Sequence, residues 1–215
     1  MREGYNRQLE QLHGELVQMG ALCEESIAAA AEALRDCSHD MTERVRHMEE
    51  AIDQKERDVE SLCLKLLLRQ QPVARDLRQI SAVLKLISDL ERIGDQAADI
   101  AELAPFLAES RQEELELVRE MARTACCMVT DSVEAFVKGD LLLAHAVCAA
   151  DDEMDALFLQ VKALIVELLR DNRAQGEAAL DLLMIAKDLE RIGDHATNVA
   201  EWVEYALTGV HPQLN

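Results

Sequence analysis

The sequence is poor in the residues that build turn-rich β proteins. Aromatic residues make up 3% of its 215 positions, and there are only eight glycines and three prolines. Because sandwiches and barrels depend on such residues, their scarcity argues against both folds and against a disordered tail. Alanine, leucine, glutamate and arginine are abundant instead, and they favour helices. The composition therefore predicts an all-α protein made of long helices.

Signals for export or membrane insertion are missing as well. No segment approaches the ~20 uncharged apolar residues that cross a bilayer. The N-terminal stretch MREGYNRQLEQLHGE contains no apolar signal core. The six cysteines show no CxxC spacing, and they are read as small core residues of a reduced chain. We therefore expect a cytoplasmic protein with no direct membrane insertion.

Positive charge is also in short supply. There are 22 lysines and arginines against 42 aspartates and glutamates, which gives a formal net charge of −20. A nucleic-acid backbone or an anionic membrane surface would be repelled by such a chain, so non-specific binding to either is excluded. An acidic surface attracts cations and basic patches on partner proteins instead.

The chain contains a tandem repeat. The segment DLERIGDQAADIAE at residues 89–102 returns as DLERIGDHATNVAE at residues 188–201, with its first seven residues unchanged. Further upstream, Met19 corresponds to Met121, so the offset there is 102 rather than 99 residues. The difference of three indicates a short deletion between the second and third elements of the second repeat. Repeats of this kind indicate two copies of one structural unit.

Each repeat is predicted to be a three-helix bundle, because apolar residues recur at spacings of three and four. Short connections make neighbouring helices antiparallel. We expect domains at 1–105 and 106–215, placed in line to give an elongated six-helix molecule. The predicted helices span about 6–35, 41–69, 73–104, 112–138, 140–170 and 174–207, with breaks at Ser38 or Asp40, Pro72, Pro105, Gly139-Asp140, Asn172 and Gly209.

Acidic pairs at a spacing of four residues occur in the second and third helix of each repeat. Side chains at this spacing share one helix face, where like charges cost a few tenths of a kcal/mol unless a cation offsets them. The pairs are Glu49–Asp53 and Glu91–Asp95 in the first repeat, and Asp151–Asp155 and Glu190–Asp194 in the second.

Hairpin geometry predicts that the two pairs of one repeat meet. Positions equidistant from the turn lie at the same height in an antiparallel hairpin, and the first repeat's pairs are equidistant from Pro72. Those of the second are equidistant from the boundary between Asn172 and Arg173. Each repeat can therefore gather four carboxylates from two helices. Gly94, inside the first motif, leaves room there for a close neighbour or a ligand.

Such all-oxygen clusters suit hard or borderline divalent cations, namely Mg²⁺, Mn²⁺ and Fe²⁺, with Zn²⁺ as a further candidate. Asp99 extends the acidic edge, whereas its counterpart Asn198 is uncharged, so both are weaker candidates and the two sites can differ. The alternative is a solvated acidic face whose carboxylates pair with nearby arginines and lysines.

Two other residue types near the motifs have simpler interpretations. The Glu-x-x-His spacing of di-iron bundles is absent, so His195 is predicted to be exposed or hydrogen-bonded rather than a ligand. Arg92 and Arg191 are expected to pair with the acids three residues before them, Asp89 and Asp188.

The segments IDQKERDVESLCLKLLLRQQPVARDLRQI and LERIGDQAADIAE, within this two-repeat pattern, resemble the PhoU family of phosphate-uptake regulators. The resemblance implies metal binding through the eight paired acids. It also implies a cytoplasmic, non-enzymatic protein, often a homodimer, that represses phosphate-starvation signalling when phosphate is plentiful. The implied partners are the nucleotide-binding subunit of the phosphate ABC transporter and a phosphate sensor histidine kinase.

Two other classes of function are considered beside this metal-loaded adaptor. One is a metal-dependent bundle enzyme, a hydrolase or oxidase, that uses the same carboxylates. Against it stand the missing histidine ligands and the lack of a recognisable nucleophile or base. The other is a structural bundle whose acidic edge is merely solvated, which predicts only weak, salt-screened metal binding.

Overall fold

The computed structural model describes residues 2–36, 39–70, 72, 75–107, 112–171 and 176–210. Within these ranges the chain is helical throughout its regular structure and forms no strand. The elements in chain order are α1 (Arg2–Asp36), α2 (His39–Gln70), α3 (Arg75–Leu103), the 3₁₀ turn η1 (Ala104–Leu107), α4 (Gln112–Lys138), α5 (Leu141–Asp171) and α6 (Gly176–Thr208).

The predicted helix ends agree with these bounds to within a few residues, with two informative differences. The helix α3 ends at Leu103, and Pro105 lies within the 3₁₀ turn η1 that follows it. Asp140 precedes α5 as its cap, and its Oδ1 accepts the backbone N–H groups of Leu142 and Leu143 at 3.0 and 3.1 Å. Gly139 takes the positive φ of 66° that this tight turn requires.

The other predicted helix breaks are confirmed in some places and not in others. Asp40 lies inside the first turn of α2 and so is not its cap. The predicted breaks at Ser38 and Asn172 lie outside the described residues. Gly209 follows α6 with a φ of 85°, and its N–H donates to the carbonyl of Tyr205 at 2.9 Å.

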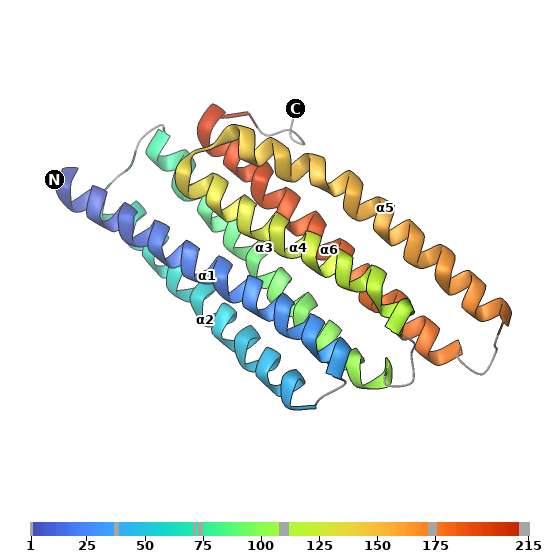
Figure 1. The fold of residues 1–215 in the computed structure, drawn as a ribbon. Helices are drawn as coiled ribbons and strands as arrows, with labels where there is room; N and C mark the ends of the chain where they lie inside the picture. Colours follow the sequence, from blue (N-terminus) through green and yellow to red (C-terminus); the bar gives the residue numbers. More distant parts are fainter. Residues whose placement is uncertain are drawn as a thin grey trace.

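The two three-helix bundles lie side by side, not in line as the sequence suggested (Figure 1). The most extensive contact between any two helices joins α3 to α6, and α1 also packs on α4. As a result, α2 and α5 occupy the outer edges, and all six helices run along one long axis. The 33 residues of α6 alone span about 50 Å.

The core follows the contact between α3 and α6. Leu90 and Ile93 of α3 and Ile192 of α6 are 0% exposed, and Leu189 is 1% exposed. Because this core lies between the repeats, they form one packed unit. Within the described residues, none of the helices is both long and apolar enough to span a lipid bilayer.

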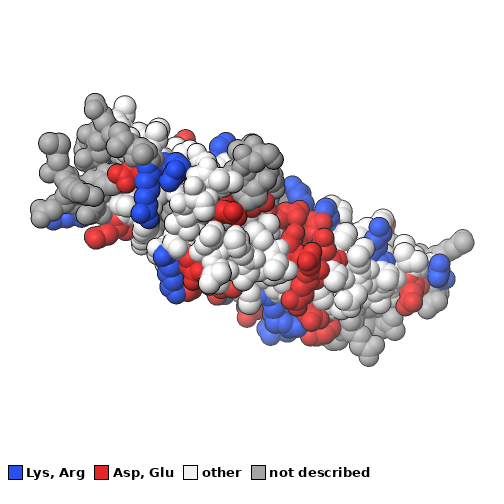
Figure 2. Space-filling view, turned by 90° about the horizontal axis from the view of Figure 1, so that it is seen from above, with Lys and Arg blue, Asp and Glu red and all other residues white. Residues whose placement is uncertain are grey.

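Charge is unevenly distributed over the surface. On the face shown in Figure 2, acidic side chains gather in a band across the long axis, with basic side chains lying more scattered. Part of the negative charge behind the net charge of −20 is thus concentrated in this acidic band. Local gathering of like charges raises the local negative potential and favours cation binding.

Candidate metal centre

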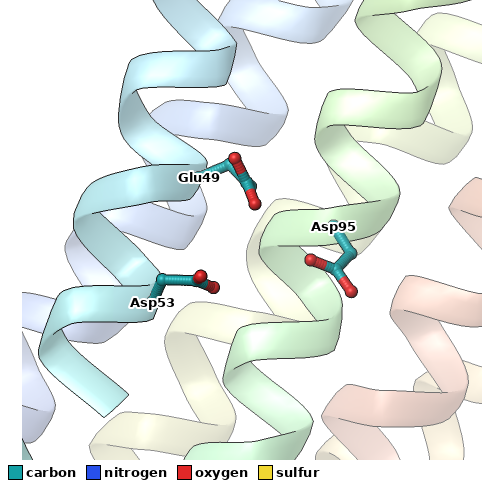
Figure 3. Close-up of side chains that lie close together, drawn as sticks. All are labelled: Glu49, Asp53 and Asp95. Carbon is teal, nitrogen blue, oxygen red and sulfur yellow. The ribbon is translucent and has the colours of Figure 1, made fainter. Parts of the chain in front are cut away.

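Three carboxylates of the first repeat converge between α2 and α3. Glu49 and Asp53 point from α2 toward Asp95 on α3 (Figure 3). One oxygen from each of these residues lies within 4.8 Å of one from each of the others, and all three side chains are half-buried. The predicted meeting of the two helices at equal distance from their turn is therefore present in the structure.

Close packing of α2 on α3 brings these residues together. A Cβ atom at Gly94 would lie 2.9 Å from Cδ1 and 3.3 Å from Cγ2 of Ile52, which is fully buried. Ile52 precedes Asp53 and Gly94 precedes Asp95, so the tightest approach of the helices lies beside the carboxylates. The glycine therefore makes room for a neighbouring side chain, not for a ligand.

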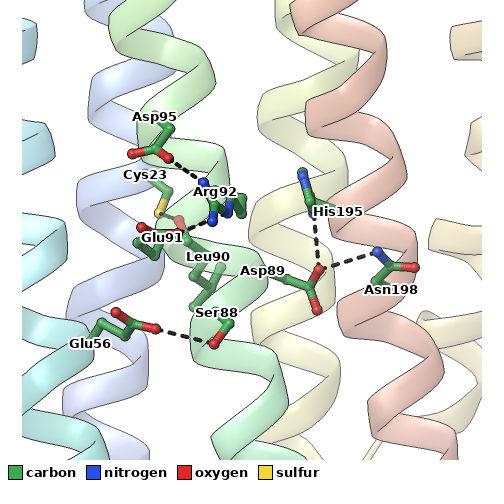
Figure 4. A network of polar contacts seen from close by, with 10 residues as sticks. All are labelled: Cys23, Glu56, Ser88, Asp89, Leu90, Glu91, Arg92, Asp95, His195 and Asn198. Carbon is green, nitrogen blue, oxygen red and sulfur yellow. Dashed lines mark hydrogen bonds and ion pairs between the residues drawn. The ribbon is translucent and has the colours of Figure 1, made fainter.

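The fourth predicted residue, Glu91, does not join this trio of Glu49, Asp53 and Asp95. Its carboxylate pairs with Arg92 Nε at 3.4 Å, and the same guanidinium contacts Asp95 Oδ2 through Nη1 at 3.1 Å (Figure 4). The predicted pairing of Arg92 with Asp89 is therefore wrong. Arg92, whose side chain is more than half exposed, lies between Glu91 and Asp95 and pairs with both.

The electrostatics of the trio favour a cation. Burial, and then the charges of Asp53 and Asp95, raise the pKa of Glu49 above its usual value. Burial followed by Asp95 likewise raises the pKa of Glu91, against the opposing effect of Arg92. Desolvation and like-charge repulsion thus destabilise the ionised forms of Glu49 and Glu91, and a divalent cation bound beside them would offset both.

The second repeat arranges its four acids more loosely. No three of Asp151, Asp155, Glu190 and Asp194 form a comparable group in the described part of the chain. Their charges nevertheless act on one another, because burial and then the carboxylates of Asp194 and Asp155 raise the pKa of Asp151. Glu190 forms an ion pair with Lys187, three residues before it.

The weaker candidates lie at the contact between the repeats. Asn198 of α6 donates from Nδ2 to Asp89 of α3 at 3.2 Å, and His195 donates from Nδ1 to the same oxygen at 2.9 Å (Figure 4). The expectation that His195 forms hydrogen bonds is thus confirmed. The role of Asp89 in joining the repeats was missed, although the exchange of Gln96 for His195 between the repeats was a signal for it.

The counterpart of Asp89 in the second repeat meets a different environment. Asp188 is 9% exposed, and Arg191 contacts it at 3.8 Å as expected from the sequence. Burial, and after it the carboxylate of Asp99, raise the pKa of Asp188 to about 6. Asp99 itself has a raised pKa, caused by burial and then by Asp95. At one contact between the repeats, His195 and Asn198 therefore hydrogen-bond to Asp89, whereas its counterpart brings the acids Asp188 and Asp99 together.

This asymmetry predicts a pH dependence for the metal-free protein. The unfolded chain releases the Asp188 proton near pH ~3.9, so the folded state holds one more proton between about pH 4 and 6. Stability should therefore rise as the pH falls through 6, and we expect a gain of about 1 kcal/mol from about pH 7.5 to 5.5. Calorimetry of Asp188→Asn should show a smaller gain, whereas an unchanged gain would contradict this assignment.

Comparison with known proteins agrees with the fold and the repeats. The PhoU domain matches residues 16–104 and 118–203. A "phosphate-specific transport system accessory protein PhoU homolog" of Clostridium acetobutylicum is 34% identical, over 100% of this chain and 99% of the relative. A protein of the same description from Pseudomonas aeruginosa is 35% identical, over 95% of this chain and 86% of the relative.

Solved structures show the same architecture. The crystal structure of PhoU from Pseudomonas aeruginosa superposes with a TM-score of 0.90 at 33% identity, covering 96% of this chain and 100% of that one. The phosphate transport system regulatory protein PhoU from Streptococcus pneumoniae gives 0.87 at 28% identity, covering 96% and 98%. These relatives are named as accessory and regulatory proteins rather than as enzymes. The sequence, the six-helix architecture and these matches together show that the chain belongs to the PhoU family.

Proposed function

We propose that this protein is a metal-binding regulator of phosphate uptake. The proposal rests above all on the convergence of Glu49, Asp53 and Asp95 from two helices. The relatives' names supply the biological context, because they describe accessory and regulatory proteins of phosphate transport.

The trio fits a small divalent cation. Oxygens around one ion at about 2.1 Å lie at most about 4.2 Å apart, so a separation within 4.8 Å needs only small side-chain rotations. The donors are all carboxylate oxygens, which favours Mg²⁺, Mn²⁺ or Fe²⁺ over metals that prefer thiolates. Three carboxylates do not fill an octahedral shell when each binds through one oxygen. The remaining positions would be open to water, to phosphate or to an acid of a partner.

The ligands of a second ion would come from the second repeat. Burial and then the nearby carboxylates of Asp194 and Asp155 raise the pKa of Asp151 there, and Glu190 would need to leave Lys187 to join them. We therefore propose unequal sites, with the first repeat loading at lower metal concentration because its trio already converges. The exposed arginines Arg57 and Arg92, which pair with Asp53 at 3.5 Å and with Asp95 at 3.1 Å, would have to release these carboxylates.

Calorimetric titration of the chelator-treated protein with Mn²⁺ tests this inequality. We expect two classes of site with affinities at least about tenfold apart, which corresponds to a difference of about 1.4 kcal/mol. Asp53→Asn should remove the tighter class, and Asp155→Asn should remove the weaker one. A single class that responds equally to both variants would contradict the assignment.

In the cell, we propose a cytoplasmic adaptor that acts between two signalling partners. These are the nucleotide-binding subunit of the phosphate ABC transporter and a phosphate sensor histidine kinase, and the adaptor represses starvation signalling when phosphate is plentiful. A homodimer would present two copies of the partner-binding surface at once. The long helices offer extended faces for both contacts, and the bound ions would reduce the negative charge that the partners meet.

Expression in a bacterial strain that lacks its own family member tests this role. The wild-type chain should restore the control of phosphate uptake by external phosphate, whereas Asp53→Asn/Asp155→Asn should not, at equal protein level. Full restoration by the double variant would separate regulation from metal binding. Failure of the wild-type chain would contradict the regulatory proposal itself.

A further inference from the structure

A cavity of about 170 Å³ opens at the end of the bundle where α4 passes into α5. It lies where α1, α3, α4 and α6 meet, away from the carboxylates of both repeats. Its walls are formed by His13, Arg75, Gln79, Phe136, Val137, Lys138, Gly139, Val203, Ala206 and Leu207.

The polar lining of this cavity is opposite in character to the rest of the molecule. Arg75 and Lys138 bring two positive charges, and His13 and Gln79 bring ring and amide N–H donors. No carboxylate lies among the described residues that line it, although the chain as a whole carries a net charge of −20. Two cations from different helices, with N–H donors and no acid in the wall, suit an anionic ligand.

The two cations can turn toward such a ligand at little cost. Arg75 is exposed and has no carboxylate within ion-pair distance in the part of the chain that the structure describes. Lys138 pairs with Glu134 four residues earlier, but both side chains are well exposed. Exposed pairs of this spacing contribute only a few tenths of a kcal/mol, so a ligand can compete for the lysine.

The inner wall of the cavity is partly apolar. The ring of His13 stands edge-to-face on Phe136, with 5.9 Å between centroids and an interplanar angle of 84°. Burial lowers the pKa of His13, so its ring is held neutral and can donate one N–H. Val203 and Ala206 of α6 are buried and close the floor. A small ligand would thus be partly shielded from water, which strengthens its contacts with the cations.

We propose that this cavity binds a small tetrahedral oxyanion such as inorganic phosphate. Arg75 and Lys138 would neutralise its charge, while Gln79 and the His13 ring would donate hydrogen bonds. This site is independent of the carboxylate trio and of any bound metal.

Titration of the chelator-treated full chain with inorganic phosphate tests the proposal without interference from metal-bound phosphate. Arg75→Gln/Lys138→Gln should weaken binding at least about tenfold, because two charge-assisted contacts are lost. The matched control Arg44→Gln/Lys65→Gln removes the same charge from exposed positions outside the cavity and should change binding less than about twofold. Sulfate, which has the same shape, should compete.

A second readout reports on the cavity itself. A bound anion beside His13 should raise the pKa of its ring, and this can be followed by the NMR signal of the imidazole as the pH is varied with and without phosphate. Absence of phosphate binding by the wild type, equal weakening in both double variants, or an unmoved His13 titration would each overturn the proposal.

Discussion

Asp95→Asn is expected to lower the affinity of the first repeat for Mn²⁺ by about 100-fold. Losing an outer partner of a metal ligand already costs 10- to 100-fold, and Asp95 is the single residue that α3 contributes to the trio. Asparagine keeps the size of the side chain but removes the charge that makes the cluster attractive to a cation. Elemental analysis after dialysis should therefore show the loss of the tightly bound metal.

The same variant separates metal binding from folding. At a metal concentration of about 100 times the dissociation constant, binding stabilises the folded state by about 2.7 kcal/mol. For a chain of this size, that corresponds to a rise in Tm of roughly 5–10 °C in the wild type. Asp95→Asn should lose most of this rise, yet without metal its stability should change little, because the loss of the exposed ion pair with Arg92 is offset by the removal of one like charge.

A matched control lies on the neighbouring helix. Asp58 of α2 is exposed and accepts a hydrogen bond from Gln54 at 3.0 Å, outside the trio. Asp58→Asn should keep both the bound metal and the thermal shift. Equal losses in the two variants would show that the metal responds to overall charge rather than to the trio.

Gly94→Val should destabilise the protein by about 1–3 kcal/mol and weaken metal binding at the same time. Its Cβ would meet the buried Ile52 at 2.9 Å, and overpacking of a filled core costs about this much. Ile52 is fully buried, so the two methyl groups of valine are expected to push α2 away from α3 as well as turn the isoleucine, which separates Glu49 and Asp53 from Asp95. Chemical denaturation and Mn²⁺ titration of the same sample measure both effects.

Gly14→Val is the control for this substitution. Gly14 lies in α1 with no neighbouring atom within 4 Å of the position of a Cβ, so valine is accommodated there. The change should be neutral or slightly stabilising, because valine favours a helix more than glycine does. If Gly94→Val proved as harmless as Gly14→Val, the tight contact would not be what assembles the trio.

Much of this site could be predicted from the sequence, because it depends on two local features: the helix period and the length of the connection between α2 and α3. The helix periods place each acidic pair on the shoulder of its helix, and the short α2–α3 connection sets their heights. Ile52 and Gly94 then lie opposite each other for the same reason, and their tight contact is present in the structure. The recurrence of the pairs in both repeats was the pattern that distinguished them from ordinary surface acids.

The packing of the two repeats and the ion pairs of Arg92 could not be predicted, because they depend on contacts between residues that the local sequence pattern does not specify. Apolar periodicity shows which face of α3 is buried, but not that α6 covers part of it, so the side-by-side arrangement of the bundles was missed. The departure of Glu91 from the trio depends on the position of Arg92, a long side chain with several competing acids nearby. Which acid an arginine contacts depends on its side-chain rotamer and not on the spacing of the residues along the helix.

Anomalous scattering from a crystal soaked with Mn²⁺ tests the central claim most directly. The account predicts a peak between α2 and α3, about 2.1 Å from carboxylate oxygens of Glu49, Asp53 and Asp95. A weaker peak should appear beside Asp151 and Asp194 at higher Mn²⁺ concentration. A fully soaked crystal with no peak at the trio, or with manganese held only by other residues, would contradict it.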